Sequence, residues 1–407
     1  MIPVSPFYTI PYLVFISFLW LLFKNEEGSL KAMSPLWSIR TAFVVAVLFL
    51  GGNYFMRSDW TDYYPLFEAL PTSSEIDIFS YRITDMAYQR YEIGYVIYAA
   101  LLKAIWADYF FIQFVTITIQ IIALFYTFRR YSASAILPFI IWSAIWGISL
   151  AIDQPRSQLA ISIFLFSIPC IENRKILSYF LLICLAYSFH HLSLVFIPIY
   201  FLAFRQIPLL WMRVLFIMGS VIYFSVIAFD INFDTFLNTH DALKAESYLA
   251  NSHGVSVPWF AKTVNYVLCV TSFFSLVYCV KHGSRQVRDI LLYNCCLLSI
   301  ILFLFFSFSF YLSQRLSVVF LFAQAMCIAR MYFLLRRNNN KHLISTFVLL
   351  LCLFFTMTRT KSIIDQYDNI LFSTKSRTEA QNASIKRILV ATGNHWILSR
   401  LGSFTVK

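Results

Sequence analysis

The chain has 407 residues, of which 59% are hydrophobic, 19% aromatic and only 13% charged. Soluble domains carry about 25% charged residues, so this composition excludes an ordinary soluble globular domain and indicates lipid as the main solvent. The formal net charge of +12 would suit a nucleic-acid partner, but the basic residues stand in short clusters between apolar runs. That arrangement is typical of membrane topology, and we expect no nucleic-acid partner.

The eight cysteines all lie inside apolar runs. No CxxC pair or His/Cys spacing typical of zinc accompanies them, and the adjacent Cys295 and Cys296 would point to different sides of a helix. We therefore predict no disulfide framework, no metal site and no cofactor. The first apolar stretch has no basic region before it and no small-residue cleavage site, so we interpret it as a mature membrane span.

A helix needs about 20 apolar residues to cross the hydrocarbon core of a bilayer. On that basis we predict an all-α, polytopic membrane protein with about twelve transmembrane helices, forming a single transmembrane domain over residues 1–407. The predicted spans lie near residues 5–23, 38–56, 109–128, 133–151, 157–171, 176–190, 192–204, 208–229, 259–280, 290–312, 316–335 and 343–358.

The basic loops fall on one side of the membrane when these spans are counted, and the positive-inside rule makes that side cytoplasmic. The count requires that residues 93–107, which are apolar but short and carry Lys103, do not cross. We predict a re-entrant or interfacial helix there. Two larger loops near 57–92 and 230–258 and the tail from Arg359 then lie outside. The basic residues on the inner side are Lys24, Lys31, Arg40, Arg129, Arg130, Arg174, Lys175, Arg205, Lys281, Arg285, Arg288, Arg336, Arg337 and Lys341.

Arg156 is the first candidate site residue on the outer side. It begins an otherwise apolar helix, and the preceding Pro155 suits the first helical turn. A helix N-terminus favours anions, and the planar guanidinium binds phosphate oxygens through paired hydrogen bonds. Either Arg156 binds an anionic substrate, or it pairs with Asp153 in a structural turn.

Arg315 is a second arginine on the predicted outer side, between two long apolar helices. It either binds an anion or extends along the helices to the membrane interface. Two arginines on the same face would suit a diphosphate, which carries more negative charge than one arginine neutralises.

His190 and His191 end an apolar helix on the same side. A histidine there can transfer protons near neutral pH or donate a hydrogen bond to a phosphate. The alternative for each is a capping or packing role. No Glu-x-x-His or His-x-x-x-His spacing accompanies them, which agrees with the prediction that no metal is bound.

The first outer loop combines acids, bases and tyrosines that would suit a sugar site, because sugar rings stack on tyrosine and carboxylates bind hydroxyl groups or act as bases. The alternative is that these charges are simply solvated. Glu92 is the strongest candidate base, because the predicted re-entrant helix would hold it at the membrane surface. The other candidates for substrate binding are Asp62, Tyr63, Tyr64 and Arg90. The second loop is polar but contains no motif.

The order of these motifs resembles the EpsG family of bacterial polysaccharide proteins and, through it, the Wzy-type O-antigen polymerases. The motifs are the acidic-aromatic element at Asp62, Tyr91-Glu-Ile-Gly-Tyr95, Arg156-Ser-Gln-Leu-Ala160, Phe189-His-His-Leu-Ser193 and Arg315. The usual Glu-Pro-Gly of the family stands here as Glu92-Ile-Gly94, and its Arg-Gln pair as Arg156-Ser-Gln158.

The resemblance implies a GT-C-like membrane glycosyltransferase of the bacterial inner membrane that needs no nucleotide sugar. Such an enzyme transfers a growing glycan from one undecaprenyl diphosphate carrier to a new lipid-linked repeat unit on the periplasmic side. The expected partners are undecaprenyl-diphosphate-linked oligosaccharides and membrane lipids, with a chain-length regulator and a flippase as further candidates. Arg156 and Arg315 would bind the diphosphate, and Glu92, His190 or His191 would deprotonate the acceptor.

Two other functions remain open from the sequence. Asp59-Trp-Thr-Asp62 is similar to the acidic motif of GT-C transferases that add a single sugar from a polyprenyl phosphate. A lipid-linked oligosaccharide flippase or other transporter is the second. Transporters often contain internal repeats and charges at mid-membrane in broken helices, whereas here the charges stand at outer helix ends and no repeat is evident.

Overall fold

The computed structural model describes residues 6–56, 59–70, 91–229, 259–283, 286–336, 341–361 and 367–392. The regular elements in these ranges are helices. An isolated antiparallel bridge also pairs Asn53 with Asn369. Contacts divide the chain into two compact units. The first comprises residues 1–130, 134–197 and 359–407, and the second 131–133 and 198–358. The single transmembrane domain over residues 1–407 stays a prediction.

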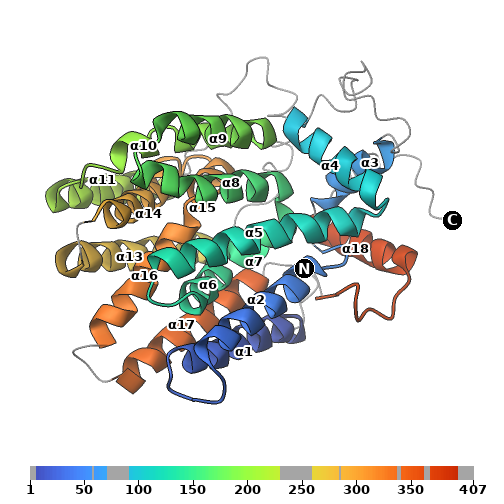
Figure 1. Cartoon of the computed structure of the whole chain (residues 1–407), viewed down its shortest axis with the longest axis horizontal. Helices are drawn as coiled ribbons and strands as arrows, with labels where there is room; N and C mark the ends of the chain where they lie inside the picture. Colours follow the sequence, from blue (N-terminus) through green and yellow to red (C-terminus); the bar gives the residue numbers. More distant parts are fainter. Residues whose placement is uncertain are drawn as a thin grey trace. The chain divides into compact units, whose positions relative to one another are not determined.

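The first unit is made of helices from both ends of the chain (Figure 1). α8 packs against α9, α1 against α2 and α6, and α4 against α9 and α3. Its elements are η1 (Pro6–Thr9), α1 (Ile10–Glu26), α2 (Pro35–Gly51), α3 (Trp60–Ala69), α4 (Ile93–Ile105), α5 (Tyr109–Tyr131), α6 (Ile136–Trp142), the π-helical η3 (Ser143–Gly147), α7 (Ile148–Asp153), α8 (Pro155–Glu172), α9 (Ile176–Phe189), the 3-10 helix η4 (His191–Phe196) and α18 (Arg377–Thr392).

α6, η3 and α7 together form the central helix of this unit. Residues Ile136–Asp153 make one apolar stretch, and 94% of it is buried. A helix that is apolar on all sides has to be covered on all sides, either by protein or by lipid. Here protein covers it: α6 packs against α1, and α7 against α2.

Contacts at the two ends of the first unit join residues that the sequence assigns to the same side of the membrane, and the sidedness itself stays a prediction. At the predicted inner end, the Glu26 carboxylate accepts the backbone N–H of Ala135 at 2.9 Å, and Arg130 pairs with Glu172 at 3.0 Å. At the predicted outer end, the Asp59 backbone N–H donates to Asp153 at 3.1 Å. Predicted inner loops thus contact inner loops, and predicted outer loops contact outer loops.

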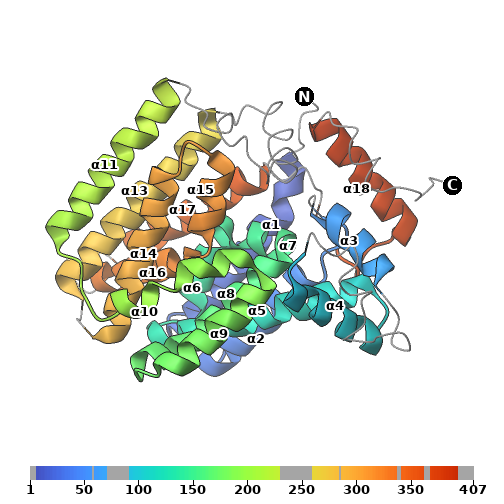
Figure 2. The same ribbon diagram turned by 90° about the horizontal axis from the view of Figure 1, so that it is seen from above.

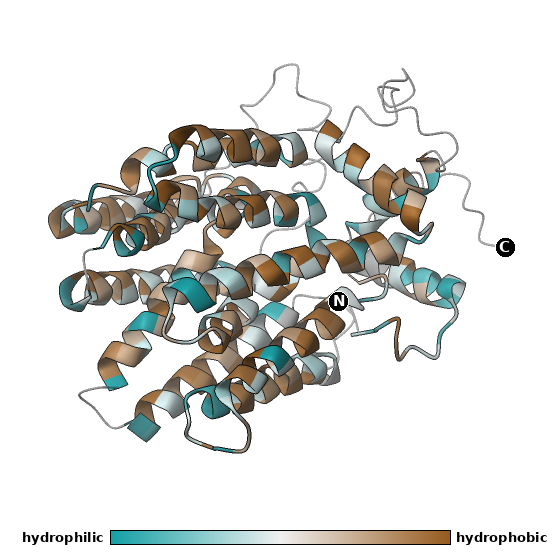
Figure 3. Ribbon diagram, in the orientation of Figure 1, coloured by the Kyte–Doolittle hydropathy of each residue, from teal (hydrophilic) through white to brown (hydrophobic). Residues whose placement is uncertain are grey.

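The C-terminal tail packs at the predicted outer end. The Tyr54 N–H donates to the Asp368 carbonyl at 3.2 Å, and the Ile370 N–H to the Gly52 carbonyl at 2.8 Å, both just after α2. Figures 1 and 2 show α18 beside α3, and Figure 3 shows that it is more polar than the largely apolar α9. The described part of the tail, residues 367–392, therefore packs beside α2 and α3, and its side of the membrane stays a prediction.

α4 covers the segment that the sequence predicts to be a re-entrant or interfacial helix, and this role stays a prediction. It has 13 residues, about 20 Å at 1.5 Å per residue, so it is short for a span. Its N-terminus contacts His190 through Glu92, while Lys103 near its other end donates to the carbonyls of Phe67 and Leu70 at 2.7 Å each. Both ends therefore meet segments that the sequence assigns to the outer side, and Lys103 satisfies carbonyls at the end of α3 that a helix terminus leaves without partners.

The second unit is a separate group of helices in which α13 packs against α16, and α14 against α11, α15 and α16. An ion pair between Asp289 and Arg330 joins α14 to α16. Its helices are α10 (Ile199–Leu202), α11 (Leu209–Ala228), α13 (Trp259–His282), α14 (Val287–Phe305), α15 (Phe310–Val318), α16 (Leu321–Arg336) and α17 (Lys341–Lys361), whose last residues belong to the first unit.

Six helices in the described ranges are long and apolar enough to cross a membrane, and α15 with α16, bent by 59°, makes a seventh if the two form one span. α1 and α2 have 17 residues each and α9 has 14. The predicted span over 192–204 is divided into η4 and α10, because Pro198 interrupts it. The chain is thus a helical, multi-pass membrane protein. The count of about twelve spans and the GT-C-like fold stay predictions.

The position of the tail can be tested by cysteine labelling. We expect Asn382→Cys, on the exposed side of α18, to react with a membrane-impermeant maleimide in intact spheroplasts. Ser29→Cys, in the predicted inner loop after α1, should react only after the membrane is permeabilised. The unmodified protein, whose cysteines lie in helices, serves as the background control. Labelling of both variants only after permeabilisation would place the tail inside.

Candidate functional site

Glu92 is the centre of a buried polar cluster at the predicted outer end of the first unit. Its side chain is only 6% exposed. One carboxylate oxygen forms an ion pair with Arg156, and the other lies 3.1 Å from Nδ1 of His190 and accepts the His191 backbone N–H at 3.3 Å. We call Tyr63, Tyr91, Glu92, Arg156 and His190 the Glu92 cluster. The structure thus brings together predicted site residues that are up to 127 positions apart in the sequence.

Arg156 is held by aromatic side chains as well as by Glu92. Its Nε donates to the Tyr63 hydroxyl at 2.8 Å, and its guanidinium lies 5.6 Å from the centre of the Tyr63 ring and 5.2 Å from that of Tyr91. These distances are typical of cation–π contacts. The guanidinium carries more N–H donors than the hydrogen bonds to Tyr63 and Glu92 use, so it retains the capacity to bind an anion.

The turn between α7 and α8 sets the position of Arg156. Pro155 occupies the first turn of α8, where its missing N–H is not needed. The buried side chain of Gln158 donates to the carbonyls of Leu150, at 2.8 Å, and Ala151 at the end of α7. The glutamine of the Arg156-Ser-Gln158 motif therefore holds the turn together, while the arginine extends into the cluster.

Gly94 allows α4 to approach α9 closely enough for Glu92 to meet His190. A Cβ atom at Gly94 would lie 2.4 Å from the Ser188 hydroxyl and 2.7 Å from the Ser188 carbonyl oxygen, which is too close for any side chain. The Glu92-Ile-Gly94 motif thus combines the carboxylate with the small residue that brings it to its partner.

The two histidines differ in exposure and contacts. His190 follows the end of α9 in an extended conformation, and its side chain is 11% exposed. His191 begins η4, is 62% exposed, and packs against Tyr187 with ring centres 4.8 Å apart and the ring planes tilted by 34°. Its Nδ1 lies 3.9 Å from the Glu92 carboxylate. Phe196 holds η4 in place. Its ring stacks on Phe164, and its backbone carbonyl accepts the Tyr179 hydroxyl at 2.6 Å.

The charge of Glu92 is set by burial and by its partners. Burial raises the pKa of the carboxyl, but hydrogen bonds from His190 and the charge and hydrogen bond of Arg156 outweigh it, so the pKa of Glu92 lies below its usual value. A carboxylate with a lowered pKa is a weak base. The contact of Glu92 with Nδ1 of His190 also orients the imidazole ring within the cluster.

Asp153, the alternative partner of Arg156 in the sequence analysis, has a different contact in the structure. The Arg156 guanidinium contacts Glu92 and Tyr63, whereas Asp153 accepts the Asp59 backbone N–H at the start of α3. Asp153 thus connects the α7–α8 turn to α3, the helix that carries Tyr63.

The remaining candidates occupy other positions. Tyr64 is 7% exposed and packs edge-on against Phe55 and Tyr109 in an aromatic core. Asp62 is half-buried, and its carbonyl accepts the Tyr91 hydroxyl at 3.0 Å. Arg315 is half-buried in α15 of the second unit. Arg90, and nearly all of the predicted loops 57–92 and 230–258, lie outside the described residues.

Tyr91 belongs to the cluster although the sequence did not single it out as a site residue. Its ring covers Arg156 and its hydroxyl fixes the Asp62 carbonyl. The available signal was its place directly before Glu92 in the Tyr91-Glu-Ile-Gly-Tyr95 motif. In the described ranges, no group of three or more His, Cys, Asp or Glu side chains is placed to hold a metal ion.

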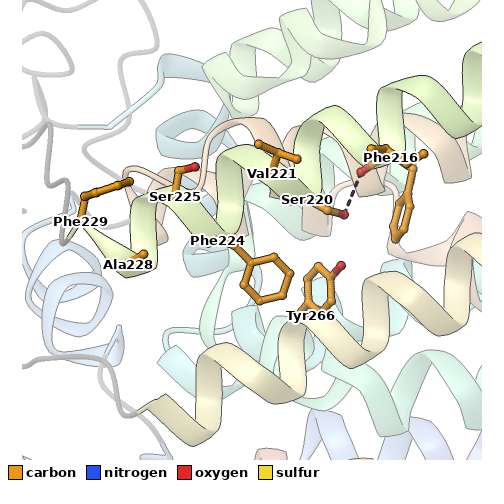
Figure 4. A pocket seen from close by; sticks show the side chains of 9 residues that line it. Phe216, Ser220, Val221, Phe224, Ser225, Ala228, Phe229 and Tyr266 are labelled. Carbon is orange, nitrogen blue, oxygen red and sulfur yellow. Dashed lines mark hydrogen bonds between the residues drawn. The ribbon is translucent and has the colours of Figure 1, made fainter.

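The second unit contains an open apolar groove of about 500 Å³ between α11 and α13 (Figure 4). Most of its lining comes from one face of α11, where residues recur every three or four positions, and Tyr266 closes it from α13. The lining residues are Phe216, Ile217, Ser220, Val221, Phe224, Ser225, Ala228, Phe229 and Tyr266. Its walls would suit a hydrocarbon chain, and the groove lies toward the predicted outer ends of both helices.

A comparison with protein families identifies the chain. The model of the EpsG family matches residues 36–372, a range that contains the whole Glu92 cluster and the groove. No curated protein and no solved structure matched the sequence. Because the matched range is far more than half of the 407 residues, the chain belongs to the EpsG family.

Proposed function

We propose that the protein is a polysaccharide polymerase, a glycosyltransferase that joins undecaprenyl-diphosphate-linked oligosaccharide repeat units at the periplasmic face of the bacterial inner membrane. The product would be O-antigen, exopolysaccharide or capsule. The observation that carries the proposal is the buried Glu92 cluster at the predicted outer end of a helical membrane protein of the EpsG family. The cluster pairs an anion-binding group with a proton acceptor, which this transfer requires.

Arg156 binds and neutralises the diphosphate of the donor in this proposal. Its guanidinium is held on three sides, by Glu92, Tyr63 and Tyr91, so it is oriented before the substrate arrives. A preoriented positive group stabilises the charge that develops on a leaving diphosphate more than a flexible one does. Arg315 is the proposed second ligand of the diphosphate, and the apolar groove of Figure 4 is a proposed path for the polyprenyl chain.

The proposed reaction is a displacement at the anomeric carbon of the donor glycan. A hydroxyl oxygen of the acceptor sugar forms a bond to that carbon, and the bond from the carbon to the diphosphate oxygen breaks. The electron pair leaves with undecaprenyl diphosphate, and the hydroxyl proton moves to the base. No metal or nucleotide sugar takes part in this scheme.

His190 is the proposed base, and Glu92 its orienting partner. Glu92 lies 3.1 Å from Nδ1 of His190, so its carboxylate would stabilise the imidazolium that forms when the ring takes the acceptor proton. His191 is the second candidate, since its more exposed ring also lies near the same carboxylate. Glu92 itself is a weaker candidate than the sequence suggested, because both of its oxygens are already engaged and its pKa is lowered.

The proposed acceptor site lies beside the cluster and includes Tyr63 and Asp62. Arg90, which is outside the described residues, stays a predicted member of it. Tyr64 is assigned to packing instead, because it is buried in the aromatic core. A chain-length regulator and a flippase remain proposed partners.

The first experiment compares surface glycan from cells with and without the gene on a gel. We expect the ladder of polymer to collapse to core plus one repeat unit and to return when the wild-type gene is restored. Loss of all surface glycan would contradict polymerisation and favour a transporter. An intact ladder with changed sugar content would favour a transferase that adds one sugar.

Arg156→Lys tests the role of the guanidinium. We expect about 100-fold less polymer, because lysine keeps the charge but loses the planar fork that binds paired oxygens. Lysine is preferred to alanine, since removing the charge leaves Glu92 buried without its ion partner, at a cost of about 3–5 kcal/mol.

Arg130→Lys is the matched control for this variant. Arg130 forms a more exposed ion pair with Glu172 in the same unit, at the predicted inner end. Its variant should retain the wild-type ladder. Equal ladders from both variants, with equal protein in the membrane, would contradict the assignment of Arg156.

The pH dependence of polymerisation by purified protein distinguishes the two kinds of base. The pKa of Glu92 is lowered, so the stability it contributes is complete above about pH 4.5 and is lost only as pH falls through its lower folded pKa. A histidine base loses activity earlier, within the range of about pH 5 to 8 where imidazoles gain a proton. We therefore expect the rate to fall between pH 8 and pH 5 while the melting temperature changes little.

Histidine variants complete this test. His190→Gln should remove the pH-dependent activity, and His282→Gln, whose ring stacks on Tyr278 in the second unit, should keep it. A rate that is unchanged down to pH 5 would point back to Glu92 as the base. Loss of activity in His191→Gln but not in His190→Gln would move the role to His191.

A further inference from the structure

α18 contacts the helix that carries Tyr63. The indole N–H of Trp60, in the first turn of α3, donates to the hydroxyl of Ser384 in α18 at 3.1 Å, and Ser384 is completely buried. Ala380 of α18 is buried in the same aromatic core, and Ile385 packs against it. α18 is therefore docked on α3 by a buried hydrogen bond and by apolar packing.

A second contact joins α18 to the start of α5. Arg377 forms an ion pair with Asp108, and its guanidinium lies 5.4 Å from the centre of the Phe110 ring. The helix begins with a capping box, in which the Ser376 hydroxyl and the Glu379 carboxylate each accept the backbone N–H of the other. α18 is thus a capped helix with specific contacts to two elements of the unit.

The docked face of α3 leads directly to the Glu92 cluster. Trp60 and Tyr63 are three residues apart, so they lie on neighbouring positions of the helix surface. Trp60 receives the contact from α18, and Tyr63 contacts Arg156. Both belong to one buried aromatic core. A shift of α3 away from α18 would therefore move the Tyr63 hydroxyl relative to the guanidinium.

The sequence places α18 beyond the part of the chain that the family match covers. The match ends at residue 372, and α18 begins at Arg377. The residues that α18 contacts, Trp60, Asp108 and Phe110, lie within the matched range. A segment outside the family match thus supports an element of the candidate site.

We propose that α18 is a positioning element of the site, and that Ser384, through Trp60 and α3, sets the place from which Tyr63 orients Arg156. The proposal rests on the proposed role of Arg156 in binding a diphosphate. Ser384 and Trp60 are positioning residues, because they act through Tyr63 and not on the substrate. The consequence is that disturbing α18 should weaken diphosphate binding even though α18 does not contact Arg156 through any residue named above.

The test measures binding of farnesyl diphosphate to the purified full-length protein. Ser384→Leu places a larger, apolar side chain in the buried contact and removes the hydroxyl, and we expect its affinity to fall about tenfold. Ser384→Thr keeps the hydroxyl and should bind within about twofold of wild type. Lys386→Ala, on the exposed side of the same helix, is the matched control and should bind as wild type does. Wild-type affinity for Ser384→Leu, with a normally folded protein, would overturn the proposal.

A double-mutant cycle separates positioning from general stability. Tyr63→Phe removes the hydroxyl that binds Arg156, so adding Ser384→Leu to it should weaken binding little further if the helix acts through Tyr63. Independent, multiplying losses would overturn the proposal, because they would show that α18 acts by another route. If Ser384→Leu does not accumulate, Arg377→Gln, which breaks the more exposed ion pair with Asp108, replaces it in the same cycle.

The binding measurement also separates this proposal from the proposed function. If the wild-type gene restores the glycan ladder but all variants bind farnesyl diphosphate as the wild-type protein does, the polymerase assignment stands and the proposed role of α18 is wrong. If the wild-type gene restores no ladder but the variants show the non-additive loss of binding, the role of α18 stands and the polymerase assignment is wrong.

Discussion

A carboxylate that is almost wholly removed from water keeps its charge here because an arginine and a histidine lie against it. Glu92 and Arg156 would each lose several kcal/mol of hydration if buried alone. Together they offset that loss, with Tyr63, Tyr91 and His190 supplying further contacts. Five elements have to meet for this to occur: α3, the residues before α4, the α7–α8 turn, the end of α9 and η4. The packing of the first unit at this end can be understood as the arrangement that keeps two opposite charges in contact.

The same interaction gives the cluster its chemical asymmetry. The ion pair is nearly neutral as a whole, so it can be buried, yet the guanidinium carries more donors than its hydrogen bonds to Tyr63 and Glu92 use. An approaching anion can therefore still form hydrogen bonds with the guanidinium, although Glu92 already neutralises much of its charge. A fully satisfied pair would be inert, and an unpaired arginine would be costly to bury. The intermediate arrangement supports the proposed binding and release of a diphosphate.

Much of this could be predicted from sequence, because apolar runs and basic clusters respond to the bilayer directly. The helix expected over 208–229 is α11 at Leu209–Ala228, and the outer-end residues Glu92, Arg156 and His190 were each identified. Their mutual contacts could not be predicted. Arg156 had Asp153 as its nearest acid in sequence, but the pairing with Glu92 depends on the close approach of Gly94 to Ser188, which has no local pattern.

Other features were missed for different reasons. The tail was recognised only as basic, although Ser376 and Glu379 form a capping box that announces α18 in the sequence. The apolar run over 192–204 predicted a helix, but a 3-10 helix and Pro198 divide it. The burial of Tyr64 and the role of Tyr91 depend on which side of a short helix or loop faces the protein, and composition alone does not determine that.

The bridge between Asn53 and Asn369 has a consequence for biosynthesis. These residues are 316 positions apart, and the second unit lies between them in the chain. Translation adds about 5 to 20 residues per second, so Asn369 is made roughly 15 to 60 s after Asn53, the residue with which it pairs. During that interval α3 also lacks α18. Until residues 367–392 are made, the end of α2 and the surface of α3 therefore lack the contacts that Asn369 and α18 supply.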